Sequence, residues 1–308
     1  NGYSAIKQLV EGVLAGVILC LAIAALYAQL IRTVRKESDM KKITSKGCIS
    51  LIPEIAVKKR EKSKKQQLLL TNKRVDWGFK QSVQAAQLRI EKQMEQEHKQ
   101  VLLVSSTLPQ EGKSMTAVNL ALAFMQHEKK TVLIDGDLRK PSVAEMLGME
   151  EQKGLAEYLK GNAKVKEVLQ KKGDLTVIQG GKVHGNISSL MDESRMEELM
   201  TFLKSEFDYV IIDTPPAYLF SDAAILAGYA DRVLYVVRHD MAEIPQIEKG
   251  MESFIQEDKL LGYLINRSQK GFASYGKYGY GKYGYGKYGK YQRYVDVKED
   301  DMDTEDSL

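Results

Sequence analysis

The tripeptide Gly112-Lys113-Ser114 is the part of this sequence whose residue types point most directly to chemistry. It lies between an apolar run at 101–105 and a stretch with helical spacing at 115–127. A loop in this position presents backbone N–H groups to phosphate oxygens, and the start of the helix adds about half a positive charge. We expect Lys113 to contact the β- and γ-phosphates of a nucleotide and the Ser114 hydroxyl to bind Mg²⁺. The expected nucleotide-binding residues of this loop are Gln110, Glu111, Gly112, Lys113, Ser114 and Met115.

Three aspartates follow apolar runs and supply the carboxylates that a metal-bound triphosphate requires. Asp135 and Asp137 stand in the motif Asp-Gly-Asp-Leu-Arg that ends at Arg139, and Asp213 begins the motif Asp-Thr-Pro-Pro. Carboxylates at a strand edge hold Mg²⁺ or its water ligands. The alternative is that such aspartates only cap the helices that follow them. Three of them together with the Gly112 loop favour the metal site.

Short apolar runs recur along the middle of the chain and predict buried strands. Helix-like stretches separate most of these runs, so the sequence predicts an α/β fold of the P-loop NTPase type. In this fold a mainly parallel sheet carries helices on both faces, and ligands bind at the carboxyl ends of the strands. The runs lie at 101–105, 131–135, 175–178, 209–213, 233–237 and 261–265.

The composition of the 308-residue chain permits a large core without disulfide bonds. Cys20 and Cys48 are its two cysteines, one in an apolar run and the other in a lysine-rich segment, which argues against a disulfide framework. The four histidines are scattered and show no metal-ligand spacing. The net charge of +4 is unevenly distributed, because residues 32–77 carry 14 basic and 5 acidic side chains.

An uncharged apolar run near the N-terminus, residues 12–31, predicts a membrane-spanning helix within residues 1–31. Twenty helical residues extend about 30 Å, the thickness of the hydrocarbon core of a bilayer. A buried helix and a signal peptide are the alternatives. Basic residues follow directly, so the positive-inside rule places the rest of the chain on the cytoplasmic side of the inner membrane. Because the chain begins with Asn, we expect a longer protein with a first membrane helix and an external domain upstream.

The basic segment 32–77 is predicted to be a linker between this helix and a nucleotide-binding domain at 78–272. It is either a solvated connection or a segment drawn to anionic lipid headgroups, where each Lys or Arg contributes about 1 kcal/mol.

The C-terminal segment 273–308 has the composition of a disordered tail. Between Tyr275 and Tyr294 it holds eight tyrosines, six glycines and five Lys or Arg residues. Glycine keeps such a ribbon mobile, so several hydroxyls can enter an active site in turn. A merely adhesive segment and a single-stranded nucleic-acid binder are the alternatives. Neither explains the nucleotide site upstream, so we expect no nucleic-acid partner. The candidate phosphorylation sites are Tyr275, Tyr278, Tyr280, Tyr283, Tyr285, Tyr288, Tyr291 and Tyr294.

Together, these motifs resemble those of the bacterial tyrosine kinases (BY-kinases) of capsule and exopolysaccharide systems, over about residues 78–294. The resemblance implies autophosphorylation on tyrosine with ATP and Mg²⁺ as cofactors. It implies that Asp135 orients or deprotonates the acceptor tyrosine, although Asp135 and Asp137 could exchange tasks. It also places Asn266 at an adenine-contacting position, with a simple turn residue as the alternative. The implied catalytic residues are Lys113, Asp135, Asp137, Arg139 and Asp213, and the implied metal ligands are Ser114, Asp137 and Asp213.

The same resemblance implies partners. The N-terminal helix and the Leu-Ile-Pro-Glu-Ile sequence at 51–55 look like the end of a polysaccharide co-polymerase, the family's membrane adaptor. We therefore expect kinase domains that self-associate and phosphorylate one another in trans. Expected further partners are the co-polymerase and polymerase-export machinery, a tyrosine phosphatase and an anionic lipid surface. The implied role is regulation of capsular or exopolysaccharide polymerisation and export.

Some positions depart from the family pattern. Thr107 stands where the loop has its first glycine, and Ile187 stands where the family has proline. Of the Glu-x-x-Arg-x-x-Arg motif used for ring assembly only Arg89 fits, with Val83 and Ala86 in the other places, so ring assembly is in doubt or uses other contacts.

Two other functions compete with the kinase. One is a membrane-associated positioning or partitioning ATPase, which usually has a lysine where Leu108 stands and lacks a tyrosine cluster. The other is a non-catalytic ATP-binding scaffold of a polysaccharide assembly.

Overall fold

The computed structural model describes residues 2–30, 32–55, 68–181 and 193–268. The chain divides into two units, residues 1–272 and residues 273–308. The second unit holds the candidate phosphorylation sites and lies outside the described residues, as does Ile187.

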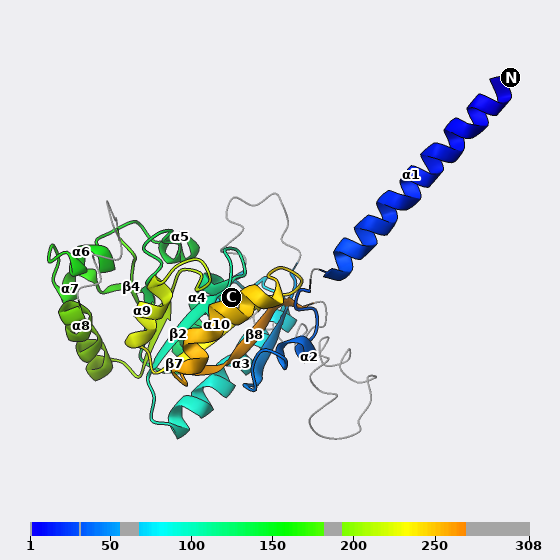
Figure 1. Ribbon diagram of the computed structural model, residues 1–308. Coiled ribbons are helices and arrows are strands. Elements are labelled where there is room, and N and C mark those ends of the chain that lie inside the picture. The colour runs from blue at the N-terminus through cyan, green and yellow to red at the C-terminus, as the bar shows by residue number, and fades with distance from the viewer. Residues whose placement is uncertain (1, 31, 56–67, 182–192, 269–308) are drawn as a thin grey trace, which may run out of the picture. The chain divides into compact units, whose positions relative to one another are not determined.

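One sheet organises the described part of the chain (Figure 1). Within that part it has eight strands, and all neighbouring strands are parallel except β4 and β5. This confirms the predicted α/β fold with a mainly parallel sheet. In spatial order the strands are β1 (Cys48–Pro53), β8 (Leu260–Ser268), β7 (Arg232–Arg238), β2 (Val101–Ser106), β6 (Tyr209–Asp213), β3 (Thr131–Asp135), β5 (Leu175–Ile178) and β4 (Gln170–Lys172).

Central strands bury both of their faces. All six residues of β2 are buried. Val101 and Leu103 pack into the core on one face of the sheet, whereas Leu102 and Val104 pack into the core on the other. Continuous apolar runs have this pattern when helices cover both faces of a parallel sheet.

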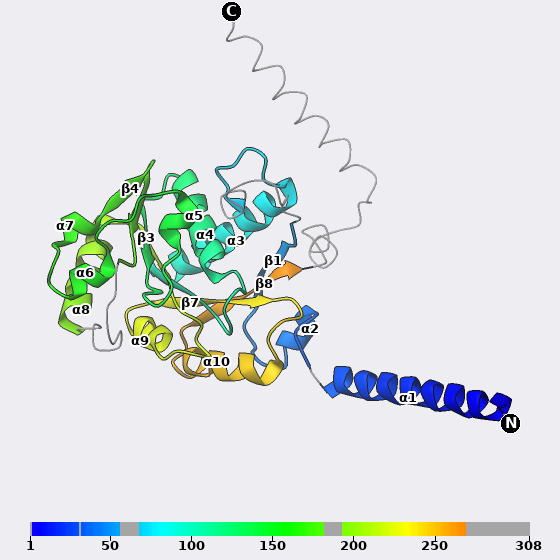
Figure 2. The same cartoon turned by 90° about the horizontal axis from the view of Figure 1, so that it is seen from above.

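Two layers of helices enclose the sheet (Figure 2). One layer contributes to the core that contains Leu102, and the other contributes to the core that contains Val101. The first layer consists of α3 (Trp77–Gln96), α4 (Lys113–Gln126) and α5 (Val143–Leu147), and the second of α6 (Leu155–Leu159), α8 (Glu193–Glu206), α9 (Asp222–Gly228) and α10 (Ile244–Gln256). Two short helices, α2 (Glu37–Met40) and α7 (Val165–Val168), add to the second layer, because Met40 and Val168 lie in the core that contains Val101.

The segment that follows the N-terminal helix is part of this domain, whereas the sequence predicted a linker there. Its strand β1 pairs in parallel with β8. Val34 and Met40 are fully buried, and Ile49 and Ile52 pack against α3. The described residues 32–55 therefore belong to the fold, because apolar side chains scattered among the basic ones fill the edge of the core.

The helix α1 spans Gly2–Leu30. Its described apolar side chains are exposed, for example Leu9 at 70% and Val13 at 61%. No helix in the described residues combines the length and apolar character needed to cross a membrane. The membrane-spanning helix predicted over residues 12–31 is therefore not confirmed.

Helix α3 contains the positions compared above with the ring-assembly motif. Val83 and Ala86 are buried, at 4% and 0% exposure, on the face that packs against the sheet. The Arg89 guanidinium donates a hydrogen bond to the Ile49 carbonyl at 2.6 Å. Val83, Ala86 and Arg89, the positions aligned with the ring-assembly motif, therefore hold α3 against the sheet and β1 within one chain.

Candidate active site

The loop between β2 and α4 has the conformation that its glycine predicts. Gly112 has a φ of 96°, in the left-handed region, and Lys113 begins the helix. A Cβ at Gly112 would lie 2.1 Å from Nδ2 of Asn266, which donates a hydrogen bond to the Glu111 carbonyl at 2.7 Å. Only glycine fits here, and the start of α4 is left open to an anion.

The Glu111 side chain holds the shape of this loop. It is fully buried and accepts hydrogen bonds from the backbone N–H groups of Leu108 at 2.6 Å and Arg238 at 3.3 Å. Burial raises its pKa to about 7, although these hydrogen bonds oppose the shift. Sequence reasoning placed Glu111 among the nucleotide contacts, but its carboxylate faces its own loop. Gln110 is exposed and its carbonyl accepts a hydrogen bond from the Arg238 guanidinium at 3.3 Å.

Lys113 lies at the centre of the predicted acidic residues. Its ammonium nitrogen is 2.9 Å from Oδ2 of Asp137 and 3.8 Å from Oδ1 of Asp213, and 3.1 Å from the Ser114 hydroxyl. Burial lowers the pKa of Lys113, but the charges of Asp213 and Asp137 outweigh this effect, so the net shift is upward. The structure thus brings together the predicted phosphate-binding lysine and the predicted metal ligands.

The carboxylates have more negative charge than their protein partners balance. Asp135 and Asp213 are directly paired positions on the neighbouring strands β3 and β6. Asp213 is completely buried, and neither of its carboxylate oxygens has a hydrogen-bond partner among the described residues. Burial raises its pKa to about 6, although the charge of Lys113 opposes this shift. A carboxylate left in this condition is suited to a further cation.

Asp135 caps a helix with one of its carboxylate oxygens, which is the alternative that the sequence analysis raised for these aspartates. Its Oδ2 accepts hydrogen bonds from the backbone N–H groups of Ser142 at 2.9 Å and Val143 at 3.0 Å, so it caps the start of α5. Its Oδ1 is buried and has no partner in the described part of the chain. Burial, followed by repulsion from Asp213, raises its pKa to about 7. One oxygen is therefore used by the fold, and the other has no partner among the described residues.

Arg139 is turned toward α9. Its Nε is 2.5 Å from Oδ2 of Asp222, and its guanidinium carbon lies 4.3 Å from the centre of the Phe220 ring. Sequence reasoning named Arg139 but missed Asp222, which is 1% exposed. An aspartate at the start of an apolar helix is normally explained by the helix dipole, so the sequence contained no signal for this pair.

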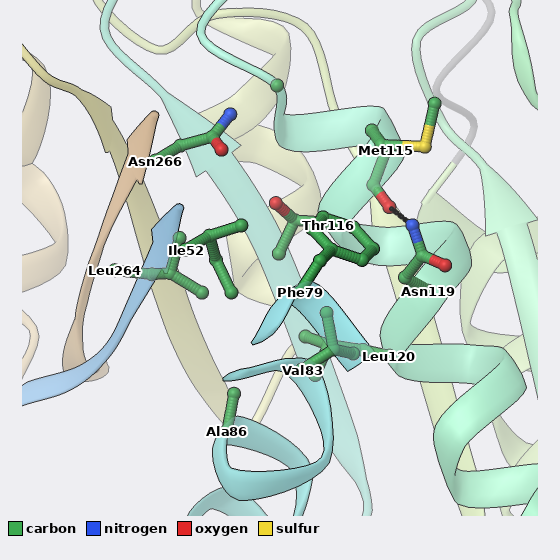
Figure 3. A pocket seen from close by; sticks show the side chains of 11 residues that line it. Ile52, Phe79, Val83, Ala86, Met115, Thr116, Asn119, Leu120, Leu264 and Asn266 are labelled. Atoms are coloured by element: carbon green, nitrogen blue, oxygen red, sulfur yellow. Dashed lines mark hydrogen bonds between the residues drawn. The ribbon is translucent and has the colours of Figure 1, made fainter. Parts of the chain in front are cut away.

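A small cavity of about 20 Å³ lies beside the loop, between α3, α4 and the strands β1 and β8 (Figure 3). Asn266 and Met115 line it together with Phe79, Thr116 and Leu120. This volume holds about one water molecule.

The site fits a magnesium nucleotide. A Cβ would fill the loop cradle at Gly112, and Asp213 keeps two unpartnered buried oxygens beside Ser114 and Asp137. Among the described residues no three His, Cys, Asp or Glu side chains form a metal site by themselves. Mg²⁺ in phosphate-transfer sites takes one or two protein carboxylates and completes its shell with phosphate oxygens and water, which agrees with this donor set.

Known proteins with similar sequences include a P-loop NTPase family and relatives named tyrosine-protein kinases. The family model "ParA: NUBPL iron-transfer P-loop NTPase" matches residues 97–227. The chain is 35% identical over 183 residues to the tyrosine-protein kinase CpsD of Streptococcus agalactiae, a match that covers 58% of this chain and 80% of that protein. It is 35% identical over 182 residues to the tyrosine-protein kinase YwqD of Bacillus subtilis (strain 168), covering 58% and 77%. The crystal structure of the chimerical protein CapA2B2 superposes with a TM-score of 0.68 at 25% identity, covering 76% of this chain and all of that one.

Proposed function

Because this chain belongs to the bacterial tyrosine-protein kinases, we propose that it transfers the γ-phosphoryl group of ATP to tyrosines of its own C-terminal segment. The acceptors are the eight tyrosines between Tyr275 and Tyr294, and the transfer takes place between two copies of the chain. The observation that carries the proposal is the position of Lys113, ion-paired with Asp137 and Asp213 directly after the loop cradle.

The residues of the site divide the work. Lys113 and the backbone N–H groups at the start of α4 bind the phosphates. Ser114, Asp137 and Asp213 would hold Mg²⁺, which would supply positive charge to offset that of the phosphoryl group. The acceptor hydroxyl oxygen bonds to the γ-phosphorus as the bond from that phosphorus to the bridging oxygen of ADP breaks. The phenol proton passes to Oδ1 of Asp135, whose pKa of about 7 suits this exchange.

The test mixes two full-length variants with ATP and Mg²⁺. The acceptor chain carries Lys113→Met and keeps all its tyrosines, whereas the donor chain keeps Lys113 and has Phe in place of the eight tail tyrosines. The proposal expects phosphotyrosine on the acceptor chain and none on either chain alone. If the wild-type chain becomes phosphorylated but the acceptor chain in the mixture does not, each chain phosphorylates only its own tail. Absence of phosphotyrosine in both experiments would refute the kinase function for this site.

We further propose that the kinase acts at the cytoplasmic face of the cell membrane, with a co-polymerase and the polymerase-export machinery of a polysaccharide as partners. The exposed apolar side chains of α1 and the basic residues that follow it support an attachment to lipid. A tyrosine phosphatase would return the tail to its unmodified state. Deleting the gene and measuring surface polysaccharide length tests this role, and an unchanged length distribution would contradict it.

A further inference from the structure

An ion pair links the two loops that carry the acidic motifs. Arg139 lies in the loop that follows β3, and Asp222 begins α9 at the end of the loop that follows β6. The strands β3 and β6 are neighbours, and their carboxyl ends hold Asp135 and Asp213. The pair therefore joins the two loops that leave the carboxyl ends of β3 and β6.

Asp222 has little to do except hold Arg139. It is 1% exposed, and its Oδ2 is bonded to Nε of Arg139. Its other oxygen, Oδ1, is buried without a hydrogen-bond partner in the described residues. A buried carboxylate in this state depends on its single cationic neighbour, so the orientation of the guanidinium and the charge of Asp222 are coupled.

Arg139 is held but not enclosed. Phe220 lies under its guanidinium, and Asp222 binds its Nε, which fixes the plane of the group. Its side chain is nevertheless 35% exposed, whereas the side chains of Lys113 and Asp137 are only 11% and 7% exposed. Arg139 is thus more accessible to a substrate that arrives from solvent than Lys113 and Asp137 are.

The surroundings of Arg139 are apolar and aromatic. In the same loop as Phe220, Tyr218 is 39% exposed and Leu219 is 46% exposed. A planar cation beside exposed apolar side chains suits a group that has an aromatic face and one polar atom, because an arginine attracts the face of a ring. A phenol has these features, and its ring can lie against the face of the guanidinium while Asp222 holds Nε.

We propose that Arg139 receives the ring of the acceptor tyrosine and that Asp222 is the positioning residue that holds Arg139 for this task. The proposal rests on the kinase function proposed above and assigns the tyrosine-specific subsite to the loops after β3 and β6. Arg139 then contributes to acceptor binding, and Lys113 to nucleotide binding. Asp222 never touches either substrate.

The test measures acceptor binding separately from catalysis. Full-length chains with Phe at the eight tail tyrosines are incubated with a non-hydrolysable ATP analogue and Mg²⁺, and a fluorescent peptide of residues 273–294 is titrated by anisotropy. Asp222→Asn, Arg139→Lys and Phe220→Leu should each weaken peptide binding on the order of tenfold. The affinity for the ATP analogue should change less than twofold. Asp222→Asn combined with Arg139→Lys should weaken binding no more than either change alone.

A matched control comes from the opposite end of the sheet. There Nε of Arg232 is 2.6 Å from Oε2 of Glu97, in a comparable arginine–carboxylate pair. Glu97→Gln should leave peptide affinity unchanged. Unchanged peptide affinity in the Asp222 and Arg139 variants, or a matching loss of analogue affinity, would overturn the proposal. If Asp222→Asn lowers the melting temperature strongly, Phe220→Leu and Arg139→Lys decide the question. In a separate reaction, the donor chain of the proposed-function test is incubated with ATP, Mg²⁺ and the same peptide. If no phosphotyrosine forms on the peptide there, the proposed kinase function fails, whatever the binding measurements show.

Discussion

Asp213→Asn should make the protein more stable and inactive at the same time. The side chain is fully buried and neither oxygen has a hydrogen-bond partner in the described part of the chain, so the Lys113 ammonium at 3.8 Å offsets its charge only in part. The folded-state pKa of about 6 lies above the unfolded value of 3.8. The wild-type side chain is therefore most favourable to folding below pH 3.8, and this contribution is lost as the pH rises through 6.

The magnitude follows from that difference. A rise from 3.8 to about 6 corresponds to about 3 kcal/mol of penalty for the charged form at neutral pH. A buried amide without partners recovers only part of this, because an unsatisfied polar group costs about 1–3 kcal/mol. We expect Asp213→Asn to raise the free energy of unfolding by about 1–2 kcal/mol at pH 7.5. For a domain of this size that is a rise in melting temperature of about 2–8 °C.

The assay is thermal unfolding with and without ATP and Mg²⁺, at pH 4.5 and pH 7.5. Without nucleotide the variant should melt above the wild type at pH 7.5, and the difference should shrink at pH 4.5. With nucleotide at about 100 times its dissociation constant, the wild type should gain about 2.7 kcal/mol, and the variant should gain little. The order of the two melting temperatures should therefore reverse.

A matched aspartate provides the control. Asp231 accepts hydrogen bonds from the backbone N–H groups of Gln100 at 3.0 Å and Val101 at 2.8 Å, at the amino end of the sheet. Asp231→Asn should destabilise the protein by about 1 kcal/mol with or without nucleotide and leave kinase activity unchanged. If Asp213→Asn destabilises the protein like Asp231→Asn, its carboxylate is a structural group and the reasoning is wrong.

Three further changes test other parts of the site and the domain. Gly112→Ala should reduce ATP affinity more than tenfold, because its Cβ would lie 2.1 Å from Nδ2 of Asn266. The control Gly173→Ala has a φ of 59° and nothing within 4 Å, so it should lose about 1 kcal/mol of stability and keep its ATP affinity. Calorimetry measures both the affinity and the stability. Burial raises the pKa of Glu111 from 4.5 to about 7. Between pH 5 and pH 8 the free energy of unfolding of the wild type should therefore fall by about 1–3 kcal/mol relative to that of Glu111→Gln. Equal pH profiles of the two proteins in urea unfolding would contradict this. A chain that begins at residue 78 should melt at a lower temperature than a chain that begins at residue 32. The shorter chain lacks β1, so the edge of β8 is exposed. Equal melting temperatures of the two chains would show that 32–77 is the linker that the sequence predicted.

The central sheet could be predicted because its strands are continuous apolar runs. The six strands predicted from such runs all form, as β2, β3, β5, β6, β7 and β8. The edge strands were missed because they carry weaker signals. β4 is Gln170–Lys172 and contains no apolar residue, and β1 stands in a strongly basic segment. Edge strands need little hydrophobicity, since they pair on one side only, and lysines protect them from further pairing.

The phosphate end of the site was also predictable. A lysine after a loop glycine and aspartates at strand ends converge in any parallel sheet, as Lys113, Asp137 and Asp213 do here. The contacts of Glu111 and Asp222 could not be predicted, because both depend on which loops lie together in space. Glu111 reaches the backbone of Arg238, 127 residues away, and Asp222 reaches Arg139 from a different strand end.

Mass spectrometry of the tail tests the central claim most directly. The full-length chain is incubated with ATP and Mg²⁺, and the phosphate on residues 273–294 is located and counted. The account predicts phosphate on tyrosines of this segment in the wild type and none in the Lys113→Met and Asp213→Asn variants. Consumption of ATP by the wild-type chain with a fully unmodified tail would contradict it.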